Sequence, residues 1–510
     1  MFGPYTTTRI IVASIVTLLL PLSLGAADKT SSDGKKGAVT VKEQHQEIGI
    51  PHGKGIIAHS NHPEAQWFPQ AGLGLFIHWG INSVKEANIS WPMIPGRALG
   101  KKKISDPAEL QRIIRESDYN LNGKKPDLSP NQYWALAKEF KPLKYDPDRW
   151  CKAAKEAGFT YAVFTTRHHD GFSMWPSDAD TFNTKLYLNG QDLVKPFVEA
   201  CRKNGLKVGL YYSPPNWYYE KDTKNFLHFS AGKLNPELPM LDADHKPVKQ
   251  IHPPVDRAKF EKGYDELVRK QIEELLTRYG KIDVLWFDGT QSTKNPEKAI
   301  SLERIRELQP GILVNPRLHG SGDFVTYERD LTTNRISNTW GEFCNTWTTM
   351  WVFDRSGFRS NAFILKDLIK CRSLGLNYLL GIGPDRNGEL HPDAYANMKI
   401  LAGWIQTNGV AIYQASPLPA GESSNVPATA FAQKRFLMIA PEFEGGAFEK
   451  NKKPLTDVTV TLTGLKSKPK SLILLTDQSP LDFTFENKTL TVRVPVAKRS
   501  NLVDVLQVDL

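Results

Sequence analysis

Short apolar runs alternate with amphipathic, charged stretches between residues 70 and 385. Such runs are typical of strands buried on both faces, and the stretches between them have helical periodicity. We expect strands at 73–77, 161–166, 205–213, 282–287, 311–317, 322–328 and 376–384, and helices at 131–140, 147–157, 193–204, 258–280 and 298–308. This repeated alternation favours an α/β fold, a TIM-like (β/α)8-type barrel at residues 66–412, over an open sheet.

The hydrophobic pattern changes near residue 416. Segments 428–443, 457–464, 471–477 and 488–496 alternate apolar and polar side chains, with turn residues between them. This period of two predicts antiparallel strands with one face on a core. We therefore expect a C-terminal antiparallel β-sandwich at 416–510. It has no cluster of acidic residues, which favours a supporting or sugar-contacting module over a second catalytic centre.

The first residues have the pattern of an export signal. Arg9 precedes an apolar run at 10–24, and Gly25, Ala26 and Ala27 supply the small side chains that a signal peptidase needs. We expect a signal peptide at 1–27, a polar tether at 28–65, and a periplasmic or secreted mature protein. No other stretch approaches the length of about 18 apolar residues that a transmembrane helix needs, so we expect no membrane span.

Charge narrows the choice of partner. The 510 residues carry a net charge of +10, which favours an anionic partner, but apart from the lysine run 101–103 the charges are dispersed. We interpret that run as a solvated loop. No nucleic-acid motif accompanies the charge, so an acidic or sulfated polysaccharide is favoured over nucleic acid.

Cofactor and metal motifs are missing from the sequence. No GxGxxG or GxxxxGK[ST] follows the first strand, which counts against a nucleotide cofactor, and we expect no cofactor. The four cysteines are far apart and form no CxxC pair, so neither a zinc site nor a disulfide framework is indicated: Cys151, Cys201, Cys344 and Cys371. One disulfide bridge between them is an alternative if the protein folds in an oxidising compartment.

Several predicted strands end in side chains suited to catalysis. The strand at 282–287 leads into Asp288 and Gly289, a pair that in isolation is more often a simple turn. Other strand ends carry polar side chains: His78, His168, His169, Tyr211 and Arg317. In a barrel the carboxyl ends of all strands meet at one mouth, so we expect these residues around one pocket.

Glycoside cleavage suits such a pocket and generally needs two carboxyl groups. Asp288 is one. Glu328 is our preferred second carboxyl, because it follows Arg317 on the next loop and because Tyr327 beside it desolvates it. Glu342 and Asp170 stay open as alternatives.

Plainer interpretations accompany these assignments. His168, His169 and Asp170 suggest a metal-dependent hydrolase, but neighbouring strand residues point to opposite faces and no HxH or HExxH motif is present. Trp79 and Trp286 are more simply core residues. Tyr211 and Tyr212 are equally suited by position to turn into the core.

Five motifs in this order strongly resemble the α-L-fucosidase family, glycoside hydrolase family 29: FIHWG, RHHDGFSMW, GLKVGLYYS, VLWFDG and LLGIGPDRNG. The resemblance spans about residues 66–412, and the β-rich tail is similar to that of these enzymes. It implies an exo-acting retaining α-L-fucosidase that acts on a fucosylated oligo- or polysaccharide, with sulfated forms left open. Asp288 would be the nucleophile.

The resemblance also implies roles for other residues. The sugar hydroxyls would be bound by His78, His168, His169, Tyr211 and Arg317. The D-F-x-T-x-E pattern of one branch of the family matches 323–328 and implies that Glu328 is the acid/base. Trp351, nine residues beyond Glu342, resembles the aromatic residue that packs on the sugar methyl.

The chain departs from the family pattern after HWG. Many members have a Glu-Trp pair that touches the sugar, whereas here Ser90 precedes Trp91 within a long insertion at 85–140. Trp91 is therefore expected to contact the sugar without the neighbouring carboxylate. An α-L-galactosidase acting on an algal-type galactan stays open, because a hydrophobic pocket rejects an added hydroxyl only modestly. A catalytically weak sugar-binding relative is a further alternative.

Overall fold

The computed structural model describes residues 57–94, 106, 108, 128–222, 240–248, 255–289, 298–331 and 339–510. The expected signal peptide, most of the expected tether and the lysine run at 101–103 lie outside the described residues. Within the described part, no helix combines the length and apolar character needed to cross a membrane.

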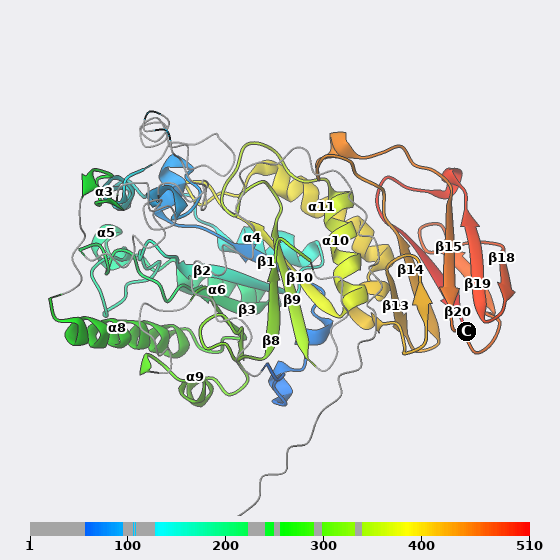
Figure 1. Cartoon of the computed structure of the whole chain (residues 1–510), viewed down its shortest axis with the longest axis horizontal. Helices are drawn as coiled ribbons and strands as arrows, with labels where there is room; N and C mark the ends of the chain where they lie inside the picture. Colours follow the sequence, from blue (N-terminus) through cyan, green and yellow to red (C-terminus); the bar gives the residue numbers. More distant parts are fainter. Residues whose placement is uncertain are drawn as a thin grey trace, which may run out of the picture. The chain divides into compact units, whose positions relative to one another are not determined.

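Eight parallel strands form one sheet in the order β7-β6-β3-β2-β1-β10-β9-β8 (Figure 1). Their bounds are β1 Leu73–Ile77, β2 Tyr161–Arg167, β3 Lys207–Tyr212, β6 Val284–Phe287, β7 Leu313–Val314, β8 Phe324–Glu328, β9 Trp340–Thr346 and β10 Leu376–Ile382. Strands β1, β2, β6, β9 and β10 are buried along their whole length, as expected for a sheet with both faces covered. The expected barrel architecture is confirmed.

The outermost strands of this order, β7 and β8, are joined through Asp323. Its backbone N–H donates to the carbonyl of Val314 at 2.8 Å, and its carboxylate accepts the Val314 N–H at 2.8 Å. Arg306 pairs with the other carboxylate oxygen at 3.0 Å. We call this junction the seam, and it nearly closes the sheet into a barrel.

Helices separate most of the strands. They are α3 Pro130–Ala135, α4 Pro147–Glu156, α5 Thr184–Tyr187, α6 Val194–Lys203, α8 Arg257–Arg278, α9 Leu302–Leu308, α10 Asn361–Leu374 and α11 Pro392–Asn408. Asp146 caps α4 and Asp256 caps α8 by accepting a backbone N–H of the first turn. Gly375, at φ 85°, ends α10 in the left-handed conformation. Helices are present at each expected position, whereas α5, α10, α11 and the barrel strand β9 are among the elements that were not expected.

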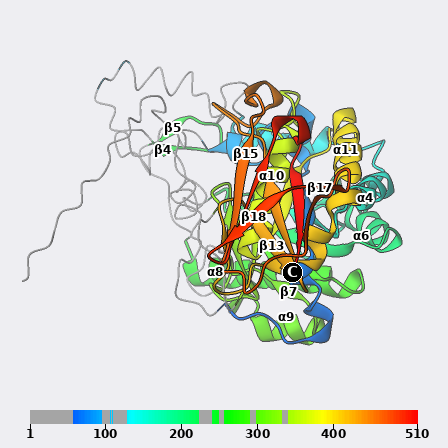
Figure 2. The same ribbon diagram turned by 90° about the vertical axis from the view of Figure 1, so that its right-hand side faces the viewer.

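Two antiparallel sheets follow the barrel, drawn in orange to red in Figure 1 and Figure 2. Their orders are β11-β13-β14-β20-β16-β17 and β12-β15-β19-β18. The bounds are β11 Ser416–Pro417, β12 Ser423–Ser424, β13 Ala428–Phe431, β14 Lys434–Ile439, β15 Val458–Thr463, β16 Ser471–Leu474, β17 Ser479–Pro480, β18 Phe483–Glu486, β19 Thr489–Val494 and β20 Asp504–Asp509. Leu437 of one sheet and Val460 and Leu490 of the other belong to one buried cluster, so the expected β-sandwich is confirmed. A separate two-stranded ribbon pairs β4 Met240–Leu241 with β5 Pro247–Val248.

Candidate active site

Asp288 and Glu328 share one guanidinium at the carboxyl ends of the strands. Asp288 follows β6 and Glu328 ends β8. Arg317, three residues beyond β7, donates from Nη1 to Asp288 Oδ1 at 2.8 Å and from Nη2 to Glu328 Oε2 at 2.7 Å. Burial lowers the pKa of Arg317, but the charges of Glu328 and Asp288 outweigh it and raise the pKa above its ordinary value. The guanidinium therefore stays charged between two carboxylates.

The second oxygen of Asp288 faces Tyr211 and His169. Tyr211 Oη donates to Asp288 Oδ2 at 2.6 Å, and His169 Nε2 lies 3.7 Å from the same oxygen. Tyr212 points to the opposite face of β3, where its hydroxyl donates to Gln271 of α8 at 3.0 Å. Strand alternation thus brings the first tyrosine of the pair to Asp288.

Two hydroxyl groups hold the paired histidines. His168 Nδ1 hydrogen-bonds Ser90 Oγ at 2.6 Å, and His169 Nδ1 hydrogen-bonds Ser213 Oγ. The His168 ring also stacks parallel to Tyr211, with centroids 5.6 Å apart. The serine hydroxyls thus fix the orientation of both imidazole rings.

His78, directly after β1, is nearly buried. Burial lowers its pKa to about 4, although the charges of Asp288 and Glu328 oppose this shift. The imidazole is therefore neutral at physiological pH and suited to hydrogen bonds with hydroxyl groups. Among the described residues its Nδ1 has no hydrogen-bond partner.

Two tryptophans from separate loops contact the histidines. Trp351 lies against His78 with ring centroids 4.9 Å apart, and Trp91 meets His169 edge-on at 5.3 Å. Trp351 is 8% exposed, and Trp91 is half-buried. Both are aromatic surfaces beside the polar groups, an arrangement common in sugar-binding sites.

The two alternative carboxyl groups lie elsewhere. Glu342, in the middle of β9, is fully buried and accepts hydrogen bonds from Tyr161 Oη at 2.6 Å and Trp286 Nε1 at 2.8 Å. Asp170 accepts the Phe172 N–H at 2.8 Å and the Tyr133 hydroxyl at 3.0 Å. Both are engaged by the protein itself, whereas Glu328 shares Arg317 with Asp288.

Sequence reasoning did not assign three residues that contact the paired histidines or the tryptophans. Ser90 was noted only for the glutamate it replaces, and Ser213 is the last residue of the quoted GLKVGLYYS motif. Trp217 packs on His169 at 5.2 Å and edge-on to Trp91 at 5.6 Å. Ser213 could have been assigned only from its place in that motif, and no sequence pattern indicated that Trp217 contacts His169.

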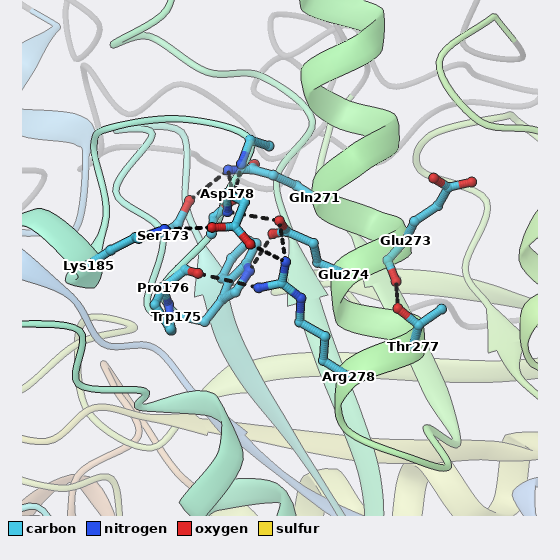
Figure 3. A network of polar contacts seen from close by, with 12 residues as sticks. Ser173, Trp175, Pro176, Asp178, Lys185, Gln271, Glu273, Glu274, Thr277 and Arg278 are labelled. Atoms are coloured by element: carbon cyan, nitrogen blue, oxygen red, sulfur yellow. Dashed lines mark hydrogen bonds and ion pairs between the residues drawn. The ribbon is translucent and has the colours of Figure 1, made fainter.

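A polar network on α8 fixes the loop that carries the paired histidines (Figure 3). Glu274 accepts hydrogen bonds from Trp175 Nε1 at 2.8 Å and from the Asp178 N–H at 2.9 Å. Gln271 Nε2 donates to Ser173 Oγ at 2.9 Å. Because Ser173 and Trp175 are buried, their polar groups must be satisfied within the protein, and these bonds restrain the loop.

A metal ion is disfavoured at this site. His168, His169 and Asp288 are the group of potential metal ligands found among the described residues, with ligand atoms within 4.8 Å of one another. Arg317 already pairs with Asp288 at 2.8 Å and would repel a cation.

The comparison with known protein families is decisive. Residues 52–410 match the family model described as Alpha-L-fucosidase. The chain belongs to the α-L-fucosidase family. It is therefore a glycoside hydrolase, and the family resemblance drawn from its motifs is confirmed.

Relatives of this family member include well-described fucosidases. Human tissue alpha-L-fucosidase is 27% identical over 378 residues, covering 70% of each chain. The alpha-L-fucosidase of Dictyostelium discoideum is 24% identical over 376 residues, covering 70% of this chain and 73% of the relative.

Solved fucosidase structures have the same fold. Alpha-L-fucosidase isoenzyme 1 from Paenibacillus thiaminolyticus aligns with a TM-score of 0.64 and 26% identity, covering 88% of this chain and 98% of that one. A glycoside hydrolase family 29 fucosidase from Bacteroides thetaiotaomicron, trapped as a covalent intermediate with 2-fluoro-fucosyl fluoride, aligns with a TM-score of 0.65 and 21% identity, covering 91% and 98%.

Proposed function

We propose that the protein is an exo-acting retaining α-L-fucosidase that removes terminal α-L-fucose from glycans by double displacement. Asp288 is the nucleophile and Glu328 the acid/base. The observation that carries this proposal is Arg317, whose two Nη atoms bind the two carboxylates at 2.8 and 2.7 Å. Two carboxylates on one planar guanidinium suit the separation of about 5–5.5 Å found in retaining enzymes better than the wider separation of inverting ones.

In the first step, an Asp288 oxygen forms a bond to the anomeric carbon while Glu328 gives its proton to the departing glycosidic oxygen. Attack converts Asp288 into a neutral ester, which removes a negative charge beside Glu328 and favours its ionised form. Glu328 then takes a proton from water, whose oxygen displaces Asp288, so the anomeric configuration is retained. The covalent intermediate trapped in the Bacteroides fucosidase supports this route.

We assign the remaining residues to sugar recognition. His78, His168, His169, Tyr211 and Arg317 bind the hydroxyl groups and the ring, and their contacts strengthen as positive charge develops on the sugar. Trp351 packs on the C5 methyl group, and Trp91 contacts the sugar from the opposite loop. The neutral His78 and the two histidine rings oriented by serine hydroxyls support these roles.

The test compares the parent with Asp288→Gly and Glu328→Ala on 4-nitrophenyl α-L-fucoside. We expect both variants to lose most activity and azide to rescue both, giving β-fucosyl azide from the first and α-fucosyl azide from the second. Asp367→Asn on α10 is the matched control, because it alters a barrel carboxyl that accepts a hydrogen bond from Tyr378 and takes no part in the two proposed steps. The same anomer from both variants would refute the assignment, and an inactive parent on every fucoside, natural glycans included, would refute the function.

α-L-Galactoside cleavage is the second candidate. The observation behind it is Ser90, which occupies the position before Trp91 and whose hydroxyl is engaged by His168 at 2.6 Å. The glutamate that many family members have at this position, and that would touch the sugar, is therefore replaced by a serine whose hydroxyl hydrogen-bonds the protein's own His168. Comparing kcat/KM on 4-nitrophenyl α-L-fucoside and α-L-galactoside decides between the two, because the sugars differ by one hydroxyl on C6. A parent that binds L-fucose but cleaves neither substrate, nor a natural fucosylated glycan, would instead be a sugar-binding relative.

We further propose that the protein is exported after cleavage near Ala27, that its domains span 66–412 and 416–510, and that sulfated glycans are among its substrates. The net charge of +10 supports the last point. Sequencing the N-terminus of the protein secreted by its host tests export. A lower cleavage rate on sulfated than on desulfated fuco-oligosaccharides would argue against the sulfated substrate.

A further inference from the structure

A buried acid that the proposed mechanism does not use lies beneath the catalytic carboxylates. Glu342 on β9 is 0% exposed. Its Oε2 accepts the hydroxyl proton of Tyr161 at 2.6 Å, and its Oε1 accepts the indole N–H of Trp286 at 2.8 Å. An unpaired carboxyl at this depth would be costly, so both bonds serve to keep it there.

Trp286 connects this acid to the catalytic residues. The guanidinium carbon of Arg317 lies over its ring at 4.5 Å, and the Tyr211 ring stacks against it at 5.6 Å with planes 17° apart. Arg317 and Tyr211 are the two groups that donate hydrogen bonds to Asp288, and Arg317 also binds Glu328. The indole is thus the surface on which the donors to both carboxylates rest.

We propose that Glu342 is a positioning residue that, through its hydrogen bond to Trp286, fixes the indole on which Arg317 and Tyr211 hold Asp288 and Glu328. The inference rests on the proposed function, since it concerns the same two carboxylates. It assigns Glu342 a role distinct from the acid/base role left open for it by the sequence.

Geometry explains why an acid serves here. The indole N–H is a single directional donor, and a fixed acceptor on the strand opposite determines the rotation of the ring about its Cβ bond. A small rotation of the ring would tilt the guanidinium and stretch its bonds to the two carboxylates. Misplacement of reacting groups by about 1 Å costs about 100-fold in rate.

Electrostatics adds a second contribution. Burial raises the pKa of Glu342 to about 7, while the hydrogen bonds from Tyr161 and Trp286 and the charge of Arg317 lower it. The titratable groups that face Glu342 are Tyr161 of β2, Cys344 of β9 and Arg317 beyond β7, and of these Arg317 alone is charged near neutral pH. An ionised Glu342 therefore stabilises the Arg317 cation from below.

The experiment replaces Glu342 by Leu and by Gln and measures kcat and KM on 4-nitrophenyl α-L-fucoside. Leucine removes the acceptor, so we expect kcat to fall by about 100-fold with a smaller change in KM. Glutamine keeps a carbonyl oxygen for Trp286 and turns its amide toward the Tyr161 oxygen, so we expect activity within a few fold of the parent. Asp367→Asn on α10, which accepts from Tyr378 at 3.5 Å, is the control for loss of a carboxyl from the barrel.

A purely structural role would lower the melting temperature of both Glu342 variants and leave kcat unchanged. A double-mutant cycle separates the cases. Trp286→Phe keeps an aromatic ring, smaller than the indole, and removes the N–H, so Glu342→Leu should add little to Trp286→Phe if the hydrogen bond carries the effect. If Glu342→Leu does not fold, Glu342→Met, which has a similar length and also lacks the carboxyl acceptor, supplies the same comparison in the two backgrounds.

The outcomes are distinguishable. An active parent with a parent-like kcat in Glu342→Leu, or strictly additive effects in the cycle, overturns this inference alone. A parent that turns over no fucoside, natural glycans included, overturns the proposed function and the inference together.

Discussion

Replacing Arg317 tests the arrangement of the two proposed catalytic carboxylates, Asp288 and Glu328, most directly. Lysine at this position keeps the charge, but its single ammonium group reaches one carboxylate at a time, whereas the guanidinium reaches both at 2.8 and 2.7 Å. Arg317 is 3% exposed, so solvent compensates little for a lost contact. A hydrogen bond to an ionised group contributes about 1.5–3 kcal/mol.

The loss of one such bond predicts that Arg317→Lys lowers kcat/KM on 4-nitrophenyl α-L-fucoside by about 30-fold, since about 1.4 kcal/mol corresponds to a factor of ten. Arg317→Met loses both bonds and the charge, about 4 kcal/mol, and should lower kcat/KM by about 1000-fold. Arg372→Lys is the matched control. Arg372 is equally buried but binds backbone carbonyls such as those of Ile412 and Leu376, so this change should lower the melting temperature without lowering kcat/KM.

The pH profile gives an independent test of the same contact. Without a cation between them, two neighbouring carboxylates disfavour each other's ionisation, so the acid limb of kcat/KM should move to higher pH in Arg317→Met. Arg317→Lys should lie between this variant and the parent. An Arg317→Met enzyme within tenfold of the parent, or one whose acid limb is unmoved, would refute the reasoning.

Three further predictions concern His78, the serine behind His168 and the cysteines. Burial lowers the pKa of His78 to about 4 from 6.5, so between these pH values the unfolded chain binds more protons than the folded protein and the free energy of unfolding falls as the pH drops. Urea unfolding at pH 7 and pH 4 measures this fall, and His78→Asn should make it smaller by about 3 kcal/mol. The same fall in the variant as in the parent would contradict the prediction. Ser90→Ala frees His168 Nδ1 and should lower kcat/KM about fivefold, with Ser90→Thr near the parent; equal rates would show that the hydroxyl does not orient the ring. The Sγ atoms of Cys151 and Cys201 lie 3.6 Å apart on α4 and α6. During refolding with glutathione disulfide, the two thiols should form a disulfide and pass two electrons and two protons to the glutathione. The oxidised protein should be about 2 Da lighter and have a melting temperature several degrees higher. Cys201→Ser should show neither change, and a parent that keeps four free thiols would refute the pairing.

Strand ends were the part of the site that the sequence could predict. Apolar runs delimit β1, β2, β3 and β6, and barrel topology alone implies that residues after them share one mouth. For this reason the sequence alone assigns His78 and Asp288, 210 positions apart, to one pocket.

Strand β9 was not predicted, for a physical reason. Its side chains alternate across the barrel wall, but the interior of this barrel is polar where Glu342 meets Tyr161 and Trp286. Glu342 and Asn345 interrupt the apolar run that would mark a buried strand, although every residue of β9 is buried. Helices α10 and α11 were not predicted either, because their apolar side chains are spread more evenly around the helix than those of α4 and α6.

Contacts made across loops could not be derived from the chain. Ser90 reaches His168 from 78 positions away, and the orientation of Ser213 toward His169 depends on how β3 twists beside β2. Similarly, no local pattern distinguishes Tyr211 from Tyr212, because either tyrosine side chain can be buried in a core. Only the register of β3 decides which of the two faces Asp288.

The seam between β7 and β8 lies directly beside Arg317 and Glu328. Strand β7 has two residues, and Asp323 supplies the hydrogen bonds that link it to β8. Arg317 lies just beyond β7 and Glu328 at the end of β8, so their 2.7 Å ion pair spans the same junction at the mouth of the barrel. The proposed acid/base is therefore linked to the proposed nucleophile across the least extensively paired part of the sheet, and we expect the distance between the two carboxyl groups to depend on Arg317 more than on strand pairing. The contacts from Trp286 on β6 and Glu342 on β9 therefore matter, because they restrain the position of Arg317. The seam alone would restrain its ion pair with Glu328 less.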